Sequence, residues 1–228
     1  MSDYAGTDNL EIMSEAVNYN RFLLRLIRAV VRPEDRIVDI GAGIGTIAKT
    51  LAAEGYRVQC VEPDPRQAAS IAAAGITVTA DIDSIEDATV DVILSFNVLE
   101  HIEDDHGALR LWTQKLRSGG RMLVYVPAFQ ILFSSMDRKV GHFRRYTLGQ
   151  LVLAARAAGL VVESARYADC AGFLATLLYK WFGSDTGEIN RKSLVAFDRY
   201  VFPVSRAADR LFRSWLGKNA VVVARRAG

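Results

Sequence analysis

The sequence predicts an α/β fold with a mostly parallel sheet that is covered by helices on both faces. From Arg36 onward, short runs rich in β-branched residues alternate with Ala- and Leu-rich stretches of helical spacing. Parallel strands need crossover connections, and helices of this length supply them. The apolar core of VDVILSF, residues 90–96, is typical of a central strand buried on both faces.

The first elements are predicted in chain order from these patterns. An amphipathic helix is predicted over Asn18–Val31, because its apolar residues share one face (Phe22, Leu23, Leu26, Ile27 and Val30). The strands that follow are Arg36–Ile40, Arg57–Glu62, Ile76–Ala80, Val90–Phe96 and Arg121–Val126. The helices between them are Thr46–Ala53, Pro65–Ala74 and Asp104–Leu116.

The pattern changes after Val126. A loop over residues 127–146 leads into a helix at Thr147–Ala158, with Thr147 as its N-cap and Gly159 just past its end. The last two strands are predicted at Leu160–Arg166 and Ala220–Arg225.

The long aromatic segment between these two strands is predicted to form helices that cover one end of the sheet, because structureless loops of that length are uncommon. We expect a single domain. Its parts are a helical lid over 1–35, a core over 36–166, a helical cap over 167–218 and the last strand over 219–228.

Composition excludes several classes of protein. The formal charge is +2, from 28 Lys and Arg against 26 Asp and Glu, which argues against nucleic-acid binding by bulk electrostatics. The two cysteines have no CxxC spacing, and the three histidines have no recognisable ligand spacing, so no metal site is expected. The N-terminus is acidic and polar, unlike a secretory signal, and no apolar stretch is long enough to cross a bilayer. We expect a soluble, cytoplasmic protein.

The strongest motif is VDIGAGIGT, residues 38–46, where a strand ends, three glycines follow and a helix begins. Glycine permits positive φ angles and a close approach of ligand to backbone. The third glycine comes one residue too early for the dinucleotide motif GxGxxG, and Asp39 would face a pyrophosphate unfavourably. With Glu62 placed for ribose hydroxyls, the pattern favours a nucleoside with an ammonium group and no phosphates, which describes S-adenosylmethionine. Ordinary turn glycines and a nicotinamide enzyme are the alternatives.

The chain resembles the class I S-adenosylmethionine-dependent methyltransferases that act on small molecules. The matching blocks are NYNRF (18–22), VDIGAGIG (38–45), VEPD (61–64), ADI (80–82), SFNVLEHIEDD (95–105), SGGRMLVYVPA (118–128) and DRKVGHFRRYT (137–147). The GHFRRYT block resembles a bacterial subgroup associated with glycan, lipid-linked or secondary-metabolite pathways. The resemblance implies a Rossmann-like seven-stranded sheet of order 3-2-1-4-5-7-6, with the last strand antiparallel, and methyl transfer to a small acceptor.

The resemblance also implies roles for residues that match the cofactor motifs. Asp39 would orient the amino-acid end, Glu62 would accept both ribose hydroxyls, and Asp81 would read the adenine edge unless it is a surface turn acid. Asn97 would line the methionine side unless it is a helix cap. The full set expected at the cofactor is Asp39, Gly41, Ala42, Gly43, Glu62, Pro63, Asp81, Ile82, Asn97, Val98 and Tyr19.

The acceptor is expected beyond the carboxyl ends of the strands. His142 is the predicted base, since its ordinary pKa suits proton removal near neutrality, and Asp137 is predicted to orient it. The flanking acids are expected to raise the pKa of His101. The residues predicted to bind the acceptor are His101, Arg144, Arg145 and Tyr146. The alternative is that ion pairs of this block only brace a lid loop.

The nature of the acceptor is left open by the sequence. The arginines of the 137–147 block favour an anionic acceptor, and O-methylation is favoured over N-methylation. The aromatic 167–216 segment either builds the acceptor pocket or a homodimer interface, or contacts a lipid-like acceptor or a membrane surface. A protein that binds S-adenosylmethionine without catalysis is the alternative from another class.

Overall fold

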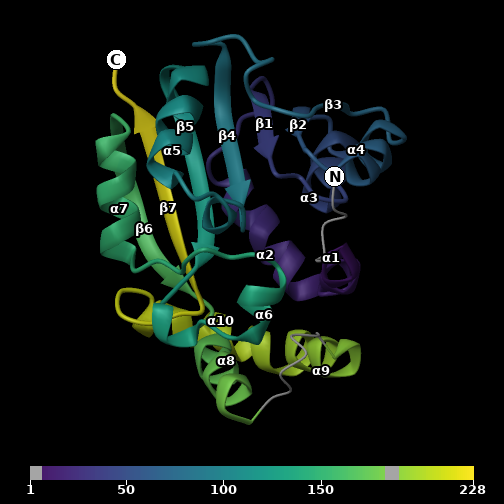
Figure 1. Cartoon of the computed structure of the whole chain (residues 1–228), viewed down its shortest axis with the longest axis vertical. Coiled ribbons are helices and arrows are strands. Elements are labelled where there is room, and N and C mark those ends of the chain that lie inside the picture. Colours follow the sequence, from purple (N-terminus) through teal and green to yellow (C-terminus); the bar gives the residue numbers. More distant parts are fainter. Residues whose placement is uncertain (1–6, 183–189) are drawn as a thin grey trace.

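The protein folds around a seven-stranded sheet of order β3-β2-β1-β4-β5-β7-β6, as seen in a computed structural model that describes residues 7–182 and 190–228 (Figure 1). The strands are β1 (Arg36–Ile40), β2 (Arg57–Val61), β3 (Thr77–Thr79), β4 (Val90–Phe96), β5 (Leu116–Pro127), β6 (Leu160–Ala168) and β7 (Asn219–Arg226). β1 to β5 pair in parallel, and β7 runs antiparallel to both β5 and β6. The predicted strand order and the antiparallel last strand are confirmed.

Alternate residues of the central strands face opposite layers of helices. On one face, Val38 and Ile93 pack against α5 (Asp105–Lys115) and α7 (Leu148–Ala157). On the other face, Ile37 packs with α2 (Val17–Arg28) and α3 (Thr46–Ala53). α4 (Pro65–Ala72) closes a smaller cluster beside β2. Both faces of β1 and β4 are therefore buried, as the apolar strand patterns predict.

Most predicted boundaries agree with the structure to within two residues. α7 begins after its N-cap Thr147, which forms a capping box with Gln150, and Gly159 beyond its end has φ +85°. β5 begins earlier than predicted, at Leu116, because an irregular stretch with a shifted register joins α5 to the regular ladder. The expected 127–146 loop contains two short helices, η2 (Gln130–Leu132) and α6 (Ser135–Lys139).

Two helical parts frame the end of the sheet where the parallel strands terminate (Figure 1). α1 (Thr7–Ser14) precedes α2 within the expected lid region, where the sequence patterns indicate only the helix at Asn18–Val31. The insertion between β6 and β7 consists of α8 (Cys170–Phe182), α9 (Arg191–Ala196), the π-helix η3 (Phe197–Val201) and α10 (Phe202–Phe212). Phe202 is buried in the same cluster as Phe22 of α2. The described parts of the insertion before the last strand are thus helical, and they pack directly on the N-terminal helix. Residues 183–189 of the expected cap lie outside the described residues.

Candidate functional site

The turn after β1 is closed by glycines that no other residue replaces without strain. Gly41, Gly43 and Gly45 have φ angles of +64°, +58° and +80°. A Cβ atom added to Gly41 would lie 2.4 Å from Cγ2 of Val98, so the loop and the β4 end approach each other closely. α3 starts directly after Gly45. The loop therefore offers backbone and a helix N-terminus at its surface, which is the geometry that binds a ligand close to the main chain.

Two buried carboxyl groups flank this loop. Asp39 is 3% exposed, and its burial together with the negative charge of Glu62 raises its pKa to about 7. Glu62 accepts hydrogen bonds from the backbone N–H groups of Gly43 (2.7 Å) and Asp64 (2.9 Å), and its burial raises its pKa. Two acids in one desolvated place favour a ligand that brings positive charge and hydroxyl donors. The ammonium, sulfonium and ribose of S-adenosylmethionine fit this donor set.

The predicted adenine-side residues lie on the loops after β2 and β3. Pro63 is exposed next to Glu62, and Ile82 is buried in the main core. Asp81 is exposed, and its Oδ1 accepts a hydrogen bond from the N–H of Ser84 at 3.2 Å. This hydrogen bond fits the alternative given above, in which Asp81 is an acid of a surface turn. Its contact with adenine stays a prediction.

Asn97 and Tyr19 meet at the end of β4. Asn97 has a positive φ of +54° and donates its N–H to the carbonyl of Tyr125 at 2.8 Å. It does not cap the following helix η1 (Leu99–His101), which begins from Val98 without a side-chain cap. The Tyr19 hydroxyl hydrogen-bonds the Asn97 side chain, and burial raises the pKa of Tyr19 to about 12. α2 therefore places a polar tyrosine at the carboxyl edge of the sheet.

One contact at the glycine loop was missed by sequence analysis. Leu10 of α1 has its Cδ1 atom 3.1 Å from the position of a Cβ on Gly43. The only hint in the sequence was the short apolar spacing of Leu10 and Ile12 within a polar stretch. α1 thus lies against the loop that is predicted to hold the cofactor.

The loop after β5 is organised around Asp137, which is 1% exposed. Its Oδ1 lies 2.7 Å from Nδ1 of His142, and Arg145 donates to both of its oxygens at 2.8 Å. Ser134 donates its N–H to Oδ2 at 2.8 Å, which starts α6. Burial opposes ionisation of Asp137, but the hydrogen bonds from His142 and Arg145 outweigh it and hold its pKa well below the ordinary value. The predicted pair Asp137 and His142 is brought together.

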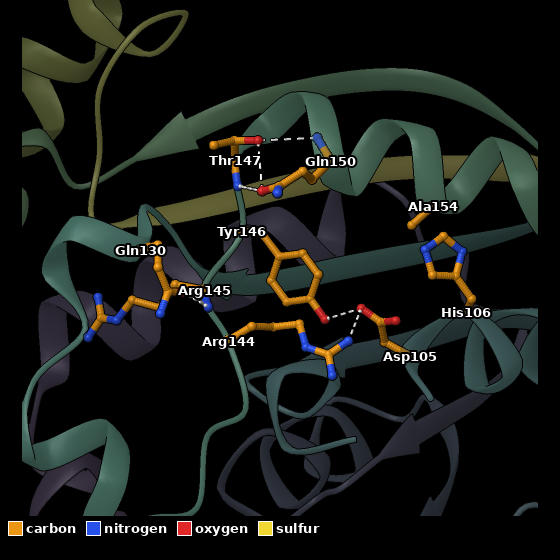
Figure 2. A pocket seen from close by; sticks show the side chains of 9 residues that line it. All are labelled: Asp105, His106, Gln130, Arg144, Arg145, Tyr146, Thr147, Gln150 and Ala154. Carbon is orange, nitrogen blue, oxygen red and sulfur yellow. Dashed lines mark hydrogen bonds and ion pairs between the residues drawn. The ribbon is translucent and has the colours of Figure 1, made fainter. Parts of the chain in front are cut away.

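Arg144 and Tyr146 point instead into a cavity of about 420 Å³ beside α5 and α7 (Figure 2). The Tyr146 hydroxyl donates to Asp105 Oδ2 at 2.7 Å, and Nη1 of Arg144 lies 3.0 Å from the same oxygen. The guanidinium of Arg145 extends away from this pair (Figure 2). The other side chains around this cavity are those of His106, Gln130, Thr147, Gln150 and Ala154. The predicted acceptor residues thus divide between two places, and both arginines have carboxylate partners.

Glu100 and His101 of η1 lie next to His142 of the loop after β5. The two imidazole rings have centroids 4.5 Å apart, and Nε2 of His142 lies 3.8 Å from Oε1 of Glu100. Glu100 is fully buried, and its burial raises its pKa to about 8. Among the described residues, neither of its carboxylate oxygens has a hydrogen-bond partner. Sequence analysis missed Glu100, because nothing in its spacing separates it from the neighbouring acids.

The expected rise in the pKa of His101 was wrong. Its burial, followed by the positive charge of a protonated His142, lowers the pKa to about 4. The flanking acids of the LEHIEDD block do not outweigh desolvation. The histidine spacing also predicted no metal site, yet Glu100, His101 and His142 place one ligand atom each within 4.8 Å of one another.

Comparisons with known proteins identify the family of this chain. A family model described as a methyltransferase domain matches residues 13–165. A ubiquinone biosynthesis O-methyltransferase from Methylocella silvestris is 35% identical over 96 residues, which cover 38% of this chain and 38% of that protein. The chain therefore spans well under half the length of this curated relative.

Two solved structures share the fold. An S-adenosylmethionine-dependent methyltransferase from Mesorhizobium loti has a TM-score of 0.58 and 20% identity, over 89% of this chain and 96% of that one. The phosphoethanolamine N-methyltransferase 2 of Haemonchus contortus in complex with S-adenosyl-L-methionine has a TM-score of 0.62 and 17% identity, over 92% of this chain and 53% of that one. The chain belongs to the methyltransferase-domain family and has the class I fold.

Proposed function

We propose that this protein transfers the methyl group of S-adenosylmethionine to a hydroxyl oxygen of a small acceptor. The observation that carries the proposal is the buried acid pair Asp39 and Glu62 around a glycine loop at the carboxyl edge of the sheet. In the reaction, an acceptor oxygen forms a bond to the methyl carbon while the carbon–sulfur bond breaks. S-adenosylhomocysteine leaves, and the acceptor loses one proton.

The cofactor is activated before it binds, so the protein has to align it and exclude water. Asp39 offsets the charge of the amino-acid end, and Glu62 accepts the ribose hydroxyls while its two backbone donors hold it in place. Tyr19 on α2 and Asn97 at the end of β4 form the wall of the cofactor pocket on its methionine side.

His142 is proposed to take the acceptor proton. Its Nδ1 faces Asp137, so the tautomer with hydrogen on Nδ1 leaves Nε2 as the basic atom on the Glu100 side. The same Asp137 holds Arg145, which fixes the position of the whole loop. Asp137 thus acts as a positioning residue for the base.

The insertion helices favour an amphiphilic or lipid-linked acceptor. Leu174, Leu178 and Trp181 lie at helical spacing along α8 and are 56%, 56% and 64% exposed. Exposed arginines at 199 and 210 follow in η3 and α10. Exposed apolar side chains beside arginines are typical of peripheral contact with an anionic membrane, and a second copy of the chain is the other candidate partner.

We propose a reducing compartment, the cytoplasm, in keeping with two free cysteines. Among the described residues, none of the helices combines the length and the apolar character that crossing a bilayer requires. We propose no nucleic-acid acceptor, given the near-neutral charge.

Two measurements test the proposal. Calorimetry should show one site for S-adenosylhomocysteine, and a mass shift of one methyl should appear in a panel of phenols, phosphorylated sugars, polyprenyl glycans and amines.

His142→Ala should lose at least about a hundredfold in rate on a hydroxyl acceptor while it keeps cofactor affinity. An amine product with an unchanged rate in His142→Ala would favour N-methylation, which needs no base when the amine is neutral. Cofactor binding without any methylated product would favour a non-catalytic partner protein.

A further inference from the structure

The cluster of Glu100, His101 and His142 has the composition of a metal site. One atom of each side chain lies within 4.8 Å of the other two. Glu100 has 0% exposure, and no other residue in the described part of the chain donates a hydrogen bond to its two carboxylate oxygens. An unsatisfied buried carboxyl group is costly, so an additional group that binds these oxygens would stabilise the fold.

The two histidines are oriented by outer partners. Nδ1 of His142 faces Oδ1 of Asp137 at 2.7 Å, which directs Nε2 toward Glu100. His101 hydrogen-bonds the backbone of Val140, which lies two residues before His142 in the loop after β5. Histidines that bind metals usually have their second nitrogen fixed by a carboxylate or a carbonyl in this way.

Arg145 does not satisfy Glu100, although it is close enough to influence the charge of that carboxyl group. Its Nε and Nη2 atoms both donate to Asp137, and the two charges offset each other. A divalent ion would therefore replace the proton of the Glu100 carboxyl group, beside an ion pair whose charges already offset each other.

We propose that Glu100, His101 and His142 bind one divalent transition-metal ion of the zinc, manganese or iron(II) type. Two imidazole nitrogens and one carboxylate oxygen suit these ions, and three protein ligands leave positions open for water or substrate. Ligand atoms at about 2.1 Å from one ion lie roughly 3.4 Å apart in a tetrahedral arrangement. The side chains therefore close inward by small rotations when the ion binds.

The role of the ion in catalysis rests on the proposed function, whereas its binding does not. An acceptor hydroxyl on an open position of the ion becomes more acidic and loses its proton to bulk water. The oxygen then forms the bond to the methyl carbon, and the electrons of the carbon–sulfur bond remain on sulfur. In the metal-bound protein the Nε2 lone pair of His142 binds the ion and does not accept the acceptor proton. The ion then activates the hydroxyl in place of His142.

The test is metal binding by the full chain after dialysis against a chelator. Co²⁺ added to this protein should bind at a ratio of one, with the visible absorption of a nitrogen and oxygen site, and Zn²⁺ should displace it. Glu100→Gln, His101→Ala and His142→Ala should each lower the Co²⁺ affinity at least tenfold. His106→Ala is the matched control, because His106 is exposed and outside the cluster. It should bind Co²⁺ as the wild type does.

Circular dichroism and S-adenosylhomocysteine binding show whether each variant is folded. Zn²⁺ should raise the melting temperature of the wild type and leave that of Glu100→Gln unchanged. Absence of saturable Co²⁺ binding to the wild type, or equal loss in His106→Ala, would overturn the metal site. If the wild type methylates a hydroxyl acceptor at full rate without any metal, the catalytic role of the ion fails, while the proposed function stands and the Co²⁺ titration alone decides the binding site. If metal binds but S-adenosylhomocysteine does not, the proposed function fails alone.

Discussion

The carboxylate of Asp198 caps the helix that carries Tyr19. Oδ1 of Asp198 accepts the backbone N–H of Tyr19 at 2.8 Å, and Oδ2 accepts that of Asn18 at 2.9 Å. The residue before the helix, Ala16, provides no side-chain cap. Two donors of α2 are thus satisfied by a residue of the insertion, which ties the helical cap to the wall of the proposed cofactor site.

Asp198→Ala should lower the free energy of unfolding by about 1 to 2 kcal/mol, because the first turn of α2 loses the two hydrogen bonds that the Asp198 carboxylate accepts. It should also weaken S-adenosylhomocysteine binding, since Tyr19 is in the turn that frays. Urea unfolding and calorimetry measure the two effects. Asp198→Asn keeps one acceptor oxygen and should lose less of both. An unchanged cofactor affinity in Asp198→Ala would separate α2 from the cofactor site.

Gly41→Ala should abolish cofactor binding, while Gly55→Ala should only reduce stability. Both glycines have positive φ angles, +64° and +90°, so both variants lose about 1 kcal/mol to backbone strain. Only Gly41 faces Val98, whose Cγ2 would lie 2.4 Å from the new Cβ. Gly55 has no heavy atom within 4 Å of that position. Calorimetry with S-adenosylhomocysteine should distinguish them, and equal affinities would refute the close approach at Gly41.

The affinity for S-adenosylhomocysteine should rise with pH between 5.5 and 7.5. The pKa of Asp39 is raised to about 7 in the folded protein, so this group is neutral at the lower pH and negative at the higher one. The ammonium of the ligand binds the negative form, and each unit below the pKa costs up to about tenfold in affinity. Asp39→Asn should bind weakly, with a flat profile. The same slope in both proteins would assign the titration elsewhere.

The same group predicts how stability changes without ligand. Because the folded pKa of Asp39 is raised, its contribution is fully present below the unfolded pKa and is lost as pH rises toward 7. Asp39→Asn should therefore unfold at higher urea concentration than the wild type at pH 8, and the difference should vanish near pH 4. A destabilised Asp39→Asn protein at pH 8 would contradict the burial cost.

The sheet was predictable because each strand is a short run of apolar and β-branched residues, and such a run can be recognised from neighbouring residues alone. The places of Gly41, Asp39 and Glu62 were predictable for the same reason, since each stands at a fixed distance from a strand end, while their contacts with the cofactor stay predictions. Glu100 was not, because its importance comes from the return of the 127–146 loop, which brings His142 within 3.8 Å of it. The cap from Asp198 was hidden likewise, since it spans 180 residues to Asn18. A contact between segments far apart in the chain produces no characteristic residue spacing, so the sequence alone does not predict it.

Arg145 and Arg144 should respond differently to loss of charge. Arg145→Gln leaves the buried Asp137 without its bidentate partner, so it should cost about 3 to 5 kcal/mol of stability. Arg144 is one-third exposed and pairs with Asp105 at the cavity of Figure 2, so Arg144→Gln should cost less than about 1 kcal/mol. If the acceptor is anionic and enters there, Arg144→Gln raises KM with kcat unchanged. Thermal unfolding and initial rates measure both, and an equal stability loss would contradict the pairing.

Contact of the insertion with a membrane predicts binding to anionic vesicles that depends on α8. Leu174 and Leu178 lie one turn apart and are each 56% exposed, so Leu174→Glu and Leu178→Glu should remove binding by both lost apolar contact and added repulsion. Leu153→Glu on α7 is the matched control, because Leu153 is 64% exposed on a helix outside the insertion. Co-sedimentation with vesicles that contain phosphatidylserine measures the effect at low and high salt. Equal vesicle binding by all variants would exclude α8 as the membrane contact. If the wild type is instead a dimer in solution and only the α8 variants are monomers, the same face binds a second copy of the chain.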